Sequence, residues 1–192
     1  MTIYRRVARL SPEHYLGRQS YFVTICCDQR VPHLRSETTA RRVLALLFEC
    51  AARHSCRLHA YCLMPDHVHI LAEGAHDGCD LREFIRLFKQ HTAFDFRNSH
   101  GRALWEKSYY DHILRTADAL EDVACYIWWN PVRKEICARP EEFPYSGSHT
   151  MDWIKHAASG TSWSAPWKKA SVVAGLQTGP KKHGSEDPPP QA

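Results

Sequence analysis

The sequence lacks the features that would place it in a membrane or in the extracellular space. No apolar run reaches about 18 residues, so we expect no transmembrane helix and no membrane partner. No apolar stretch follows Met1, which argues against a signal peptide. None of the eight cysteines forms a CxxC pair, and most lie within apolar patterns. Reduced, buried thiols in a cytoplasmic protein are therefore expected, rather than a zinc ribbon or a disulfide framework.

Lysine is absent from the first 54 residues, where nine arginines accompany four acidic residues and give a net charge of +5. Residues 55–150 carry 11 basic and 14 acidic residues, a net of −3, and the remainder carries five lysines and three acids, a net of +2. Arginine binds phosphate in a bidentate manner better than lysine does. The basic N-terminal segment thus favours a nucleic-acid partner. The alternative is a solvated, arginine-rich surface.

Composition divides the chain into three regions. Residues 1–18 form a basic arm that contains one proline and one glycine. Residues 19–153 carry the apolar periodicity of one globular domain. Residues 154–192 are rich in proline, lysine and serine, so a flexible tail is expected there.

The order of the predicted elements indicates an α+β fold. Alternating or β-branched patterns predict strands, and apolar residues at helical spacing after Ser36, Asp80 and Asp118 predict capped helices. The predicted strands are 21–26, 58–64, 67–72 and 109–114, and the predicted helices are 36–53, 80–97 and 118–130. The sequence order is strand, helix, strand, strand, helix, strand, which is the split βαβ order of the ferredoxin-like fold. That fold is an antiparallel sheet with helices on one face, here followed by a C-terminal helix that carries a tyrosine.

Two groups of residues could carry chemistry. His67 and His69 flank Val68 on a predicted strand, so both imidazoles lie on one face, at a separation that suits a divalent metal ion. The alternative is an ordinary hydrogen-bonded histidine pair. Tyr126 and Asn130 are four residues apart and share one face of the last helix. Taken alone, they could equally be a half-buried aromatic residue and a helix C-cap.

Three segments in this order resemble the HUH-type single-tyrosine transposases, in particular the branch associated with repetitive extragenic palindromes (REP). They are Met64–Leu71 (MPDHVHIL), Leu104–Arg115 (LWEKSYYDHILR) and Tyr126–Arg133 (YIWWNPVR). The resemblance extends from about Tyr4 to Ser148 and leaves the tail uncovered.

The resemblance implies a metal-dependent reaction on single-stranded DNA. His67 and His69 would hold Mg²⁺ or Mn²⁺, and Asn130 would complete the site. Many insertion-sequence enzymes carry Gln at that position, and Asn is one methylene shorter. Tyr126 would be the nucleophile that forms a 5′-phosphotyrosine. Because a free tyrosine has a pKa of about 10, it needs assistance, for which His112 and Asp122 are the candidates.

The implied partner is single-stranded DNA that forms palindromic hairpins. A nucleoid-associated protein is therefore expected, either as a homodimer with the tyrosine helix supplied in trans or as a monomer. Two other readings stay open: a nucleic-acid-binding module without catalysis, and a metal-dependent hydrolase or phosphodiesterase that uses water. The expected DNA contacts are Arg5, Arg6 and Arg9 in the arm, and Arg115, Arg133 and Lys134 beside the site.

Overall fold

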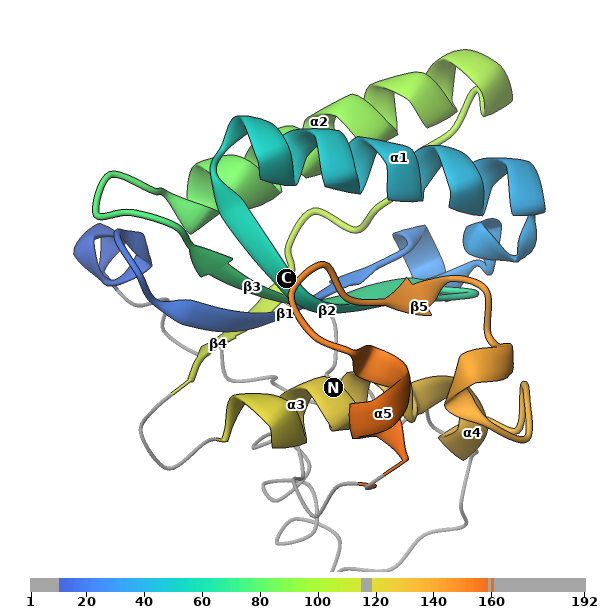
Figure 1. The fold of residues 1–192 in the computed structure, drawn as a ribbon. Coiled ribbons are helices and arrows are strands. Elements are labelled where there is room, and N and C mark those ends of the chain that lie inside the picture. Colours follow the sequence, from blue (N-terminus) through green and yellow to red (C-terminus); the bar gives the residue numbers. More distant parts are fainter. Residues whose placement is uncertain (1–10, 115–118, 159, 161–192) are drawn as a thin grey trace, which may run out of the picture.

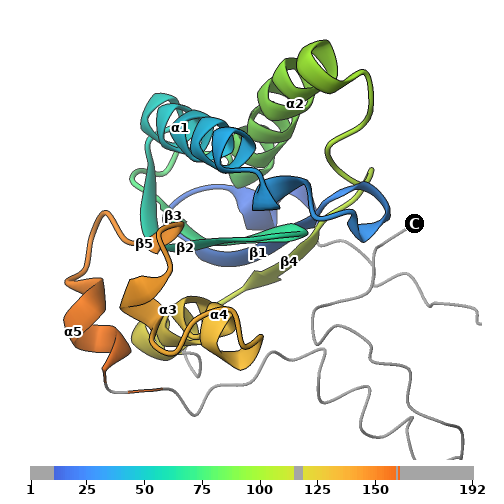
Figure 2. The same ribbon diagram turned by 90° about the vertical axis from the view of Figure 1, so that its right-hand side faces the viewer.

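A five-stranded antiparallel sheet forms the middle layer of the fold, with helices on both of its faces (Figures 1 and 2). The computed structural model describes residues 11–114, 119–158 and 160. The strand order β4-β1-β3-β2-β5 confirms the predicted split βαβ arrangement, to which β5 is added beside β2. The strands are β1 (Ser20–Cys26), β2 (Cys56–Met64), β3 (His67–Gly74), β4 (Tyr110–Ile113) and β5 (Ser146–Gly147).

Two long helices, α1 (Glu37–Arg53) and α2 (Leu81–His100), cover one face of the sheet. Both begin where the sequence predicts, because the Ser36 hydroxyl accepts the N–H of Thr39 and the Asp80 carboxylate accepts two N–H groups of the first turn. Helix α2 extends to Gly101, whose φ of 68° ends the helix in a left-handed conformation.

The tyrosine-bearing helix α3 (Leu120–Trp128) lies on the opposite face, together with α4 (Asn130–Arg133) and α5 (Trp153–Ala157). Its apolar residues Val123 and Ile127 belong to one buried cluster with Phe22 and Leu71 of the central strands. The central strands are therefore buried on both faces. Short 3-10 turns complete the fold: η1 (Pro12–Tyr15), η2 (Asp28–Arg30), η3 (His33–Arg35) and η4 (Pro140–Glu142).

The packed unit extends beyond both boundaries expected from composition. Tyr15, within the predicted arm, is 2% exposed and donates a hydrogen bond to Asp111 (2.6 Å). At the other end, α5 packs on α3: Ala157 is 2% exposed, and its carbonyl accepts a hydrogen bond from the Trp129 indole (2.8 Å). Arg5, Arg6 and Arg9, the DNA contacts predicted in the arm, and residues 161–192 of the predicted tail lie outside the described residues.

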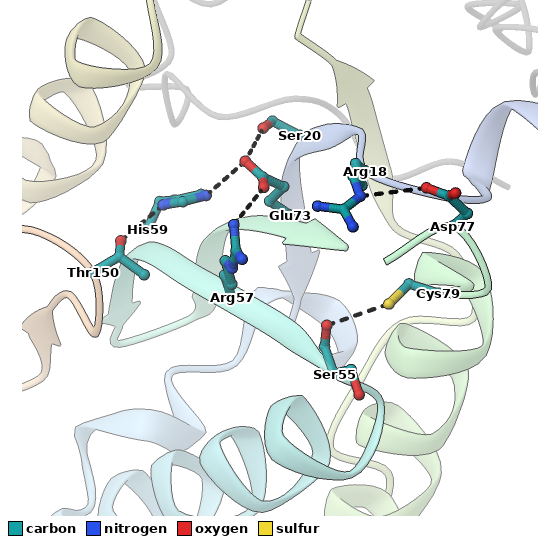
Figure 3. A network of polar contacts seen from close by, with 9 residues as sticks. All are labelled: Arg18, Ser20, Ser55, Arg57, His59, Glu73, Asp77, Cys79 and Thr150. Atoms are coloured by element: carbon teal, nitrogen blue, oxygen red, sulfur yellow. Dashed lines mark hydrogen bonds and ion pairs between the residues drawn. The ribbon is translucent and has the colours of Figure 1, made fainter. Parts of the chain in front are cut away.

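A polar network centred on Glu73 joins three elements at the end of β3 remote from His67 (Figure 3). The Glu73 carboxylate accepts hydrogen bonds from Ser20 (3.3 Å) and Arg57 (3.2 Å) and contacts His59 Nε2 (3.2 Å). His59 Nδ1 in turn contacts the Thr150 hydroxyl (2.8 Å), which ties the segment after β5 to the sheet. This network helps to fix the path by which the chain returns to α5.

Two further predictions concern membrane helices and cysteines. Among the described residues, no helix has the length and apolar character needed to cross a bilayer. All eight cysteines are free thiols, and six of them are buried. Burial, with the nearby Cys79 and Asp80, raises the pKa of Cys56 to about 12. Structural thiols therefore account for the cysteine content.

Candidate active site

The histidine pair lies on the α3 face of the sheet, as the spacing of two residues predicts. Val68 and Ile70 point to the other face, into the core under α1 and α2. His67 is 2% exposed, and His69 is fully buried. Their Nε2 atoms are 3.1 Å apart, within hydrogen-bond distance, so these two nitrogens face one another.

The other nitrogen of each ring contacts a polar side chain. His67 Nδ1 lies 2.6 Å from the Asp66 carboxylate, which also forms an ion pair with Arg30 (3.2 Å). His69 Nδ1 lies 2.8 Å from the Thr24 hydroxyl, across the β1–β3 ladder. Such partners fix the orientation of an imidazole and leave its second nitrogen for a ligand.

The donor set fits a divalent cation. At their observed separation of 3.1 Å, both Nε2 atoms could bind one divalent cation. Among residues 11–114, 119–158 and 160, no cluster of three or more His, Cys, Asp and Glu side chains could hold a metal ion. Oxygen ligands, which Mg²⁺ and Mn²⁺ prefer, could be supplied by an amide, by water or by a phosphate.

Helix α3 places Tyr126 beside this pair within a single chain. The centroid of its ring lies 6.5 Å from that of His69 and 6.1 Å from that of Phe22, which meets it edge-on. Tyr126 is 2% exposed. The structure thus brings together the three residues that sequence reasoning singled out, without a contribution from a second chain.

A second tyrosine occupies the same face. Tyr110 of β4 pairs in register with Thr24, the hydrogen-bond partner of His69. Its side chain therefore lies on the α3 face. Burial, reinforced by the negative charge of Asp111, raises the pKa of Tyr110 above its ordinary range.

The helix predicted to end at about Asn130 ends at Trp128, and the short helix α4 follows after Trp129. Pro131 has no N–H to donate to the Ile127 carbonyl, so the α-helical hydrogen-bond series cannot continue. Asn130 Nδ2 instead lies 3.3 Å and 3.4 Å from the carbonyl oxygens of Tyr126 and Ile127. The amide therefore caps α3, which leaves Oδ1 as the atom of Asn130 that could bind a cation.

Arg133 packs on the tyrosine. Its guanidinium carbon lies 4.2 Å from the centroid of the Tyr126 ring, and its Nη2 donates a hydrogen bond to the Tyr126 carbonyl (2.6 Å). Sequence reasoning assigned Arg133 to DNA and missed this contact. The spacing of seven residues, two helical turns, was the signal that could have revealed it.

The remaining predicted residues occupy different positions. His112 pairs in register with Phe22, so its side chain lies on the α3 face. Asp122 is half-buried on α3, one turn before Tyr126, and Lys134 is half-buried just after α4. Arg115 lies outside the described residues, as do Arg5, Arg6 and Arg9.

Comparisons with known proteins bear on the family and the fold. A family model described as "Transposase IS200 like" matches residues 16–129, from just before β1 to just after α3. A protein of Haemophilus influenzae, named "Putative REP-associated tyrosine transposase", is 26% identical over 145 residues, which cover 67% of this chain and 79% of that protein. A solved structure of a REP-associated tyrosine transposase bound to a REP hairpin shares the fold, with a TM-score of 0.58 and 20% identity. The match covers 76% of this chain and 82% of that one. Since the family model spans more than half of the chain, the protein belongs to the IS200-like transposase family.

Proposed function

We propose that the protein cleaves and rejoins single-stranded DNA beside hairpin-forming palindromes, in a metal-dependent reaction with a 5′-phosphotyrosine intermediate. The observation that carries the proposal is the position of Tyr126. The centroid of its ring lies 6.5 Å from that of His69, whose Nε2 atom lies 3.1 Å from the Nε2 atom of His67. Membership of a transposase family supports enzymatic DNA processing. The names of the two relatives favour a REP-type hairpin as the substrate.

The reaction is a transesterification at phosphorus. The phenolic oxygen of Tyr126 attacks the scissile phosphate, a bond from phosphorus to this oxygen forms, and the bond to the 3′ oxygen breaks. The phenol loses its proton and the departing strand ends as a 3′-OH. Because one phosphoester replaces another, rejoining needs no external energy source. The reverse attack by a 3′-OH releases Tyr126.

Two residues are proposed to assist the proton transfers. His112 is the stronger candidate, because its side chain lies on the same face of the sheet as the histidine pair. Asp122, one helical turn before Tyr126, is the second. Either could accept the phenolic proton and return one to the leaving oxygen, directly or through water.

The residues proposed to hold the cation are His67 and His69 through Nε2, and Asn130 through Oδ1. When bound, Mg²⁺ or Mn²⁺ would supply Lewis acidity to the scissile phosphate. Asp66 and Thr24 would keep the two imidazoles in their orientation, since each contacts the outer ring nitrogen.

The predicted contacts to DNA are also part of the proposal. Arg5, Arg6, Arg9, Arg115 and Lys134 remain predicted phosphate ligands. His67, His69 and Tyr126 lie side by side in one chain, which favours a monomer as the catalytic unit over a homodimer with exchanged helices. A nucleoid-associated location follows from such a substrate.

A covalent-adduct assay tests the proposal. The wild-type protein is incubated with a single-stranded hairpin DNA and Mn²⁺ or Mg²⁺, and the mixture is resolved under denaturing conditions. We expect an adduct with the wild type and with Tyr110→Phe, and none with Tyr126→Phe. Tight binding of hairpins without any adduct would favour the non-catalytic binding module. Cleavage without an adduct would favour a hydrolase that uses water.

A further inference from the structure

We infer that Arg133 is a positioning residue for Tyr126 rather than a contact to DNA. The inference rests on the proposed function, because it assigns Arg133 a part in the reaction of that tyrosine. It differs from the expectation drawn from sequence, where the basic residues around the site were all assigned to phosphate.

The first observation is that Arg133 contacts Tyr126 in two ways. The guanidinium carbon lies 4.2 Å from the ring centroid, within the range of a cation–π interaction. The Nη2 atom donates to the Tyr126 carbonyl at 2.6 Å, which secures the backbone of the same residue. A lysine could supply the charge, but its ammonium lacks the planar fork that serves both contacts.

The second observation is the environment of the ring. Phe22 meets Tyr126 edge-on (6.1 Å), and His69 lies 6.5 Å away, again between ring centroids. Arg133 adds a charged contact to these aromatic neighbours. A side chain held by several elements keeps its rotamer, and displacement of a reacting group by about 1 Å can cost about 10²-fold in rate.

The third observation is the break between α3 and α4. Because Pro131 cannot donate to α3, side chains supply hydrogen bonds at the end of the helix, and Arg133 is one of them. Its guanidinium thus closes the helix end while it packs on the ring two turns earlier. The positive charge also lies beside a ring whose oxygen gains negative charge when the phosphotyrosine bond breaks, which favours the tyrosine as a leaving group.

Lys134 is the matched control. It is the next residue, it is also basic and half-buried, and no contact joins it to Tyr126 in the described part of the chain. If basic residues at this end of α4 bind phosphate, replacement of Lys134 should weaken DNA binding. The slope of the logarithm of the binding constant against the logarithm of the salt concentration should also fall in magnitude by about one.

The experiment compares Arg133→Gln, Arg133→Lys and Lys134→Gln with the wild type. It measures the rate of adduct formation at saturating hairpin DNA. The dissociation constant for the same DNA is measured separately, with each variant combined with Tyr126→Phe so that no adduct forms. Arg133→Gln should lower the rate by about 10²-fold and leave the dissociation constant close to its starting value. Arg133→Lys should recover part of the rate. Lys134→Gln should raise the dissociation constant, as expected of a phosphate contact.

A second experiment distinguishes loss of the positioning contact from loss of folding. Arg133→Ala is assayed with added guanidinium at concentrations that leave the wild type unaffected, after circular dichroism has shown that the variant is folded. Recovery of the rate by guanidinium in Arg133→Ala, but not in Tyr126→Phe, supports the positioning role. Failure of both guanidinium and Arg133→Lys to restore any rate contradicts it.

The remaining outcomes separate the two proposals. If Arg133→Gln forms the adduct as fast as the wild type at saturation and binds DNA more weakly, Arg133 is a DNA contact and the inference is wrong, while the proposed function stands. If the wild type forms no adduct with any hairpin tested, the proposed function fails, and the role of Arg133 in the reaction fails with it.

Discussion

Replacement of Asp66 by Asn tests whether the histidine pair is a metal site held by its outer partners. The Asp66 carboxylate lies 2.6 Å from His67 Nδ1, and His67 is 2% exposed. The variant keeps a hydrogen-bond acceptor at that point and removes the negative charge that makes the imidazole a stronger base. We therefore expect weaker binding of a divalent cation without a change of fold.

The magnitude follows from the surroundings of the carboxylate. Loss of an outer partner of this kind costs about 10–100-fold in metal affinity. The Asp66 side chain is 27% exposed and also pairs with the Arg30 guanidinium. Water and this positive charge therefore weaken the effect of the carboxylate on the His67 imidazole. We therefore expect a loss at the lower end of this 10–100-fold range: Asp66→Asn should reduce the affinity for the divalent cation about tenfold, or by about 1.4 kcal/mol. Asp66→Ala, which also removes the acceptor, should approach the upper end.

Titration of Mn²⁺ into the full chain, followed by electron paramagnetic resonance or calorimetry, measures the effect. Asp77→Asn is the control, because the side chain of Asp77 is 96% exposed and pairs with Arg18 at the surface. His67→Ala should abolish binding. The reasoning is refuted if Asp66→Asn binds Mn²⁺ as tightly as the wild type while His67→Ala does not bind it.

Three other changes have defined expectations. Thr24→Val removes the partner of His69 Nδ1 and should lower Mn²⁺ affinity less than Asp66→Ala does, since a neutral hydrogen bond is worth about 1 kcal/mol; an equal or larger loss in the same titration would contradict this ranking. Ile127→Ala empties a fully buried position under α3 and should cost about 2–5 kcal/mol in urea unfolding, whereas Ile154→Ala, at a side chain 55% exposed, should be nearly neutral. Burial raises the pKa of Cys56 to about 12, so its contribution to stability is present below about pH 9 and is lost as pH rises from there through 12. Alkylation of Cys56 at pH 9 should accordingly be far slower in the folded protein than in urea, and equal rates would rule out the buried thiol.

Local rules predicted the parts of the site that depend on neighbouring residues. The period of two along β3 placed His67 and His69 opposite Val68, and the capping residues Ser36 and Asp80 marked the starts of two helices. The end of the third helix was also predicted, since Pro131 has no N–H to donate: the expected end at about Asn130 lies within two residues of the observed last residue, Trp128.

Other features depend on contacts between distant segments. The pairing of Thr24 with His69 is set by the register of β1 against β3, which no short pattern specifies. The contact of Arg133 with the Tyr126 ring is a local exception: its spacing of seven residues indicates the contact, whereas charge alone does not. The boundary at residue 153 followed composition, yet Ala157 is small enough to pack against α3 and continues the folded unit.

The central claim is that Tyr126 becomes covalently attached to DNA. The most direct measurement is peptide mapping by mass spectrometry of the adduct formed with a hairpin substrate, after nuclease and protease digestion. The account predicts a nucleotide phosphate on the peptide that contains Tyr126, and an unmodified peptide that contains Tyr110. A phosphate on Tyr110 or on any other residue would contradict it.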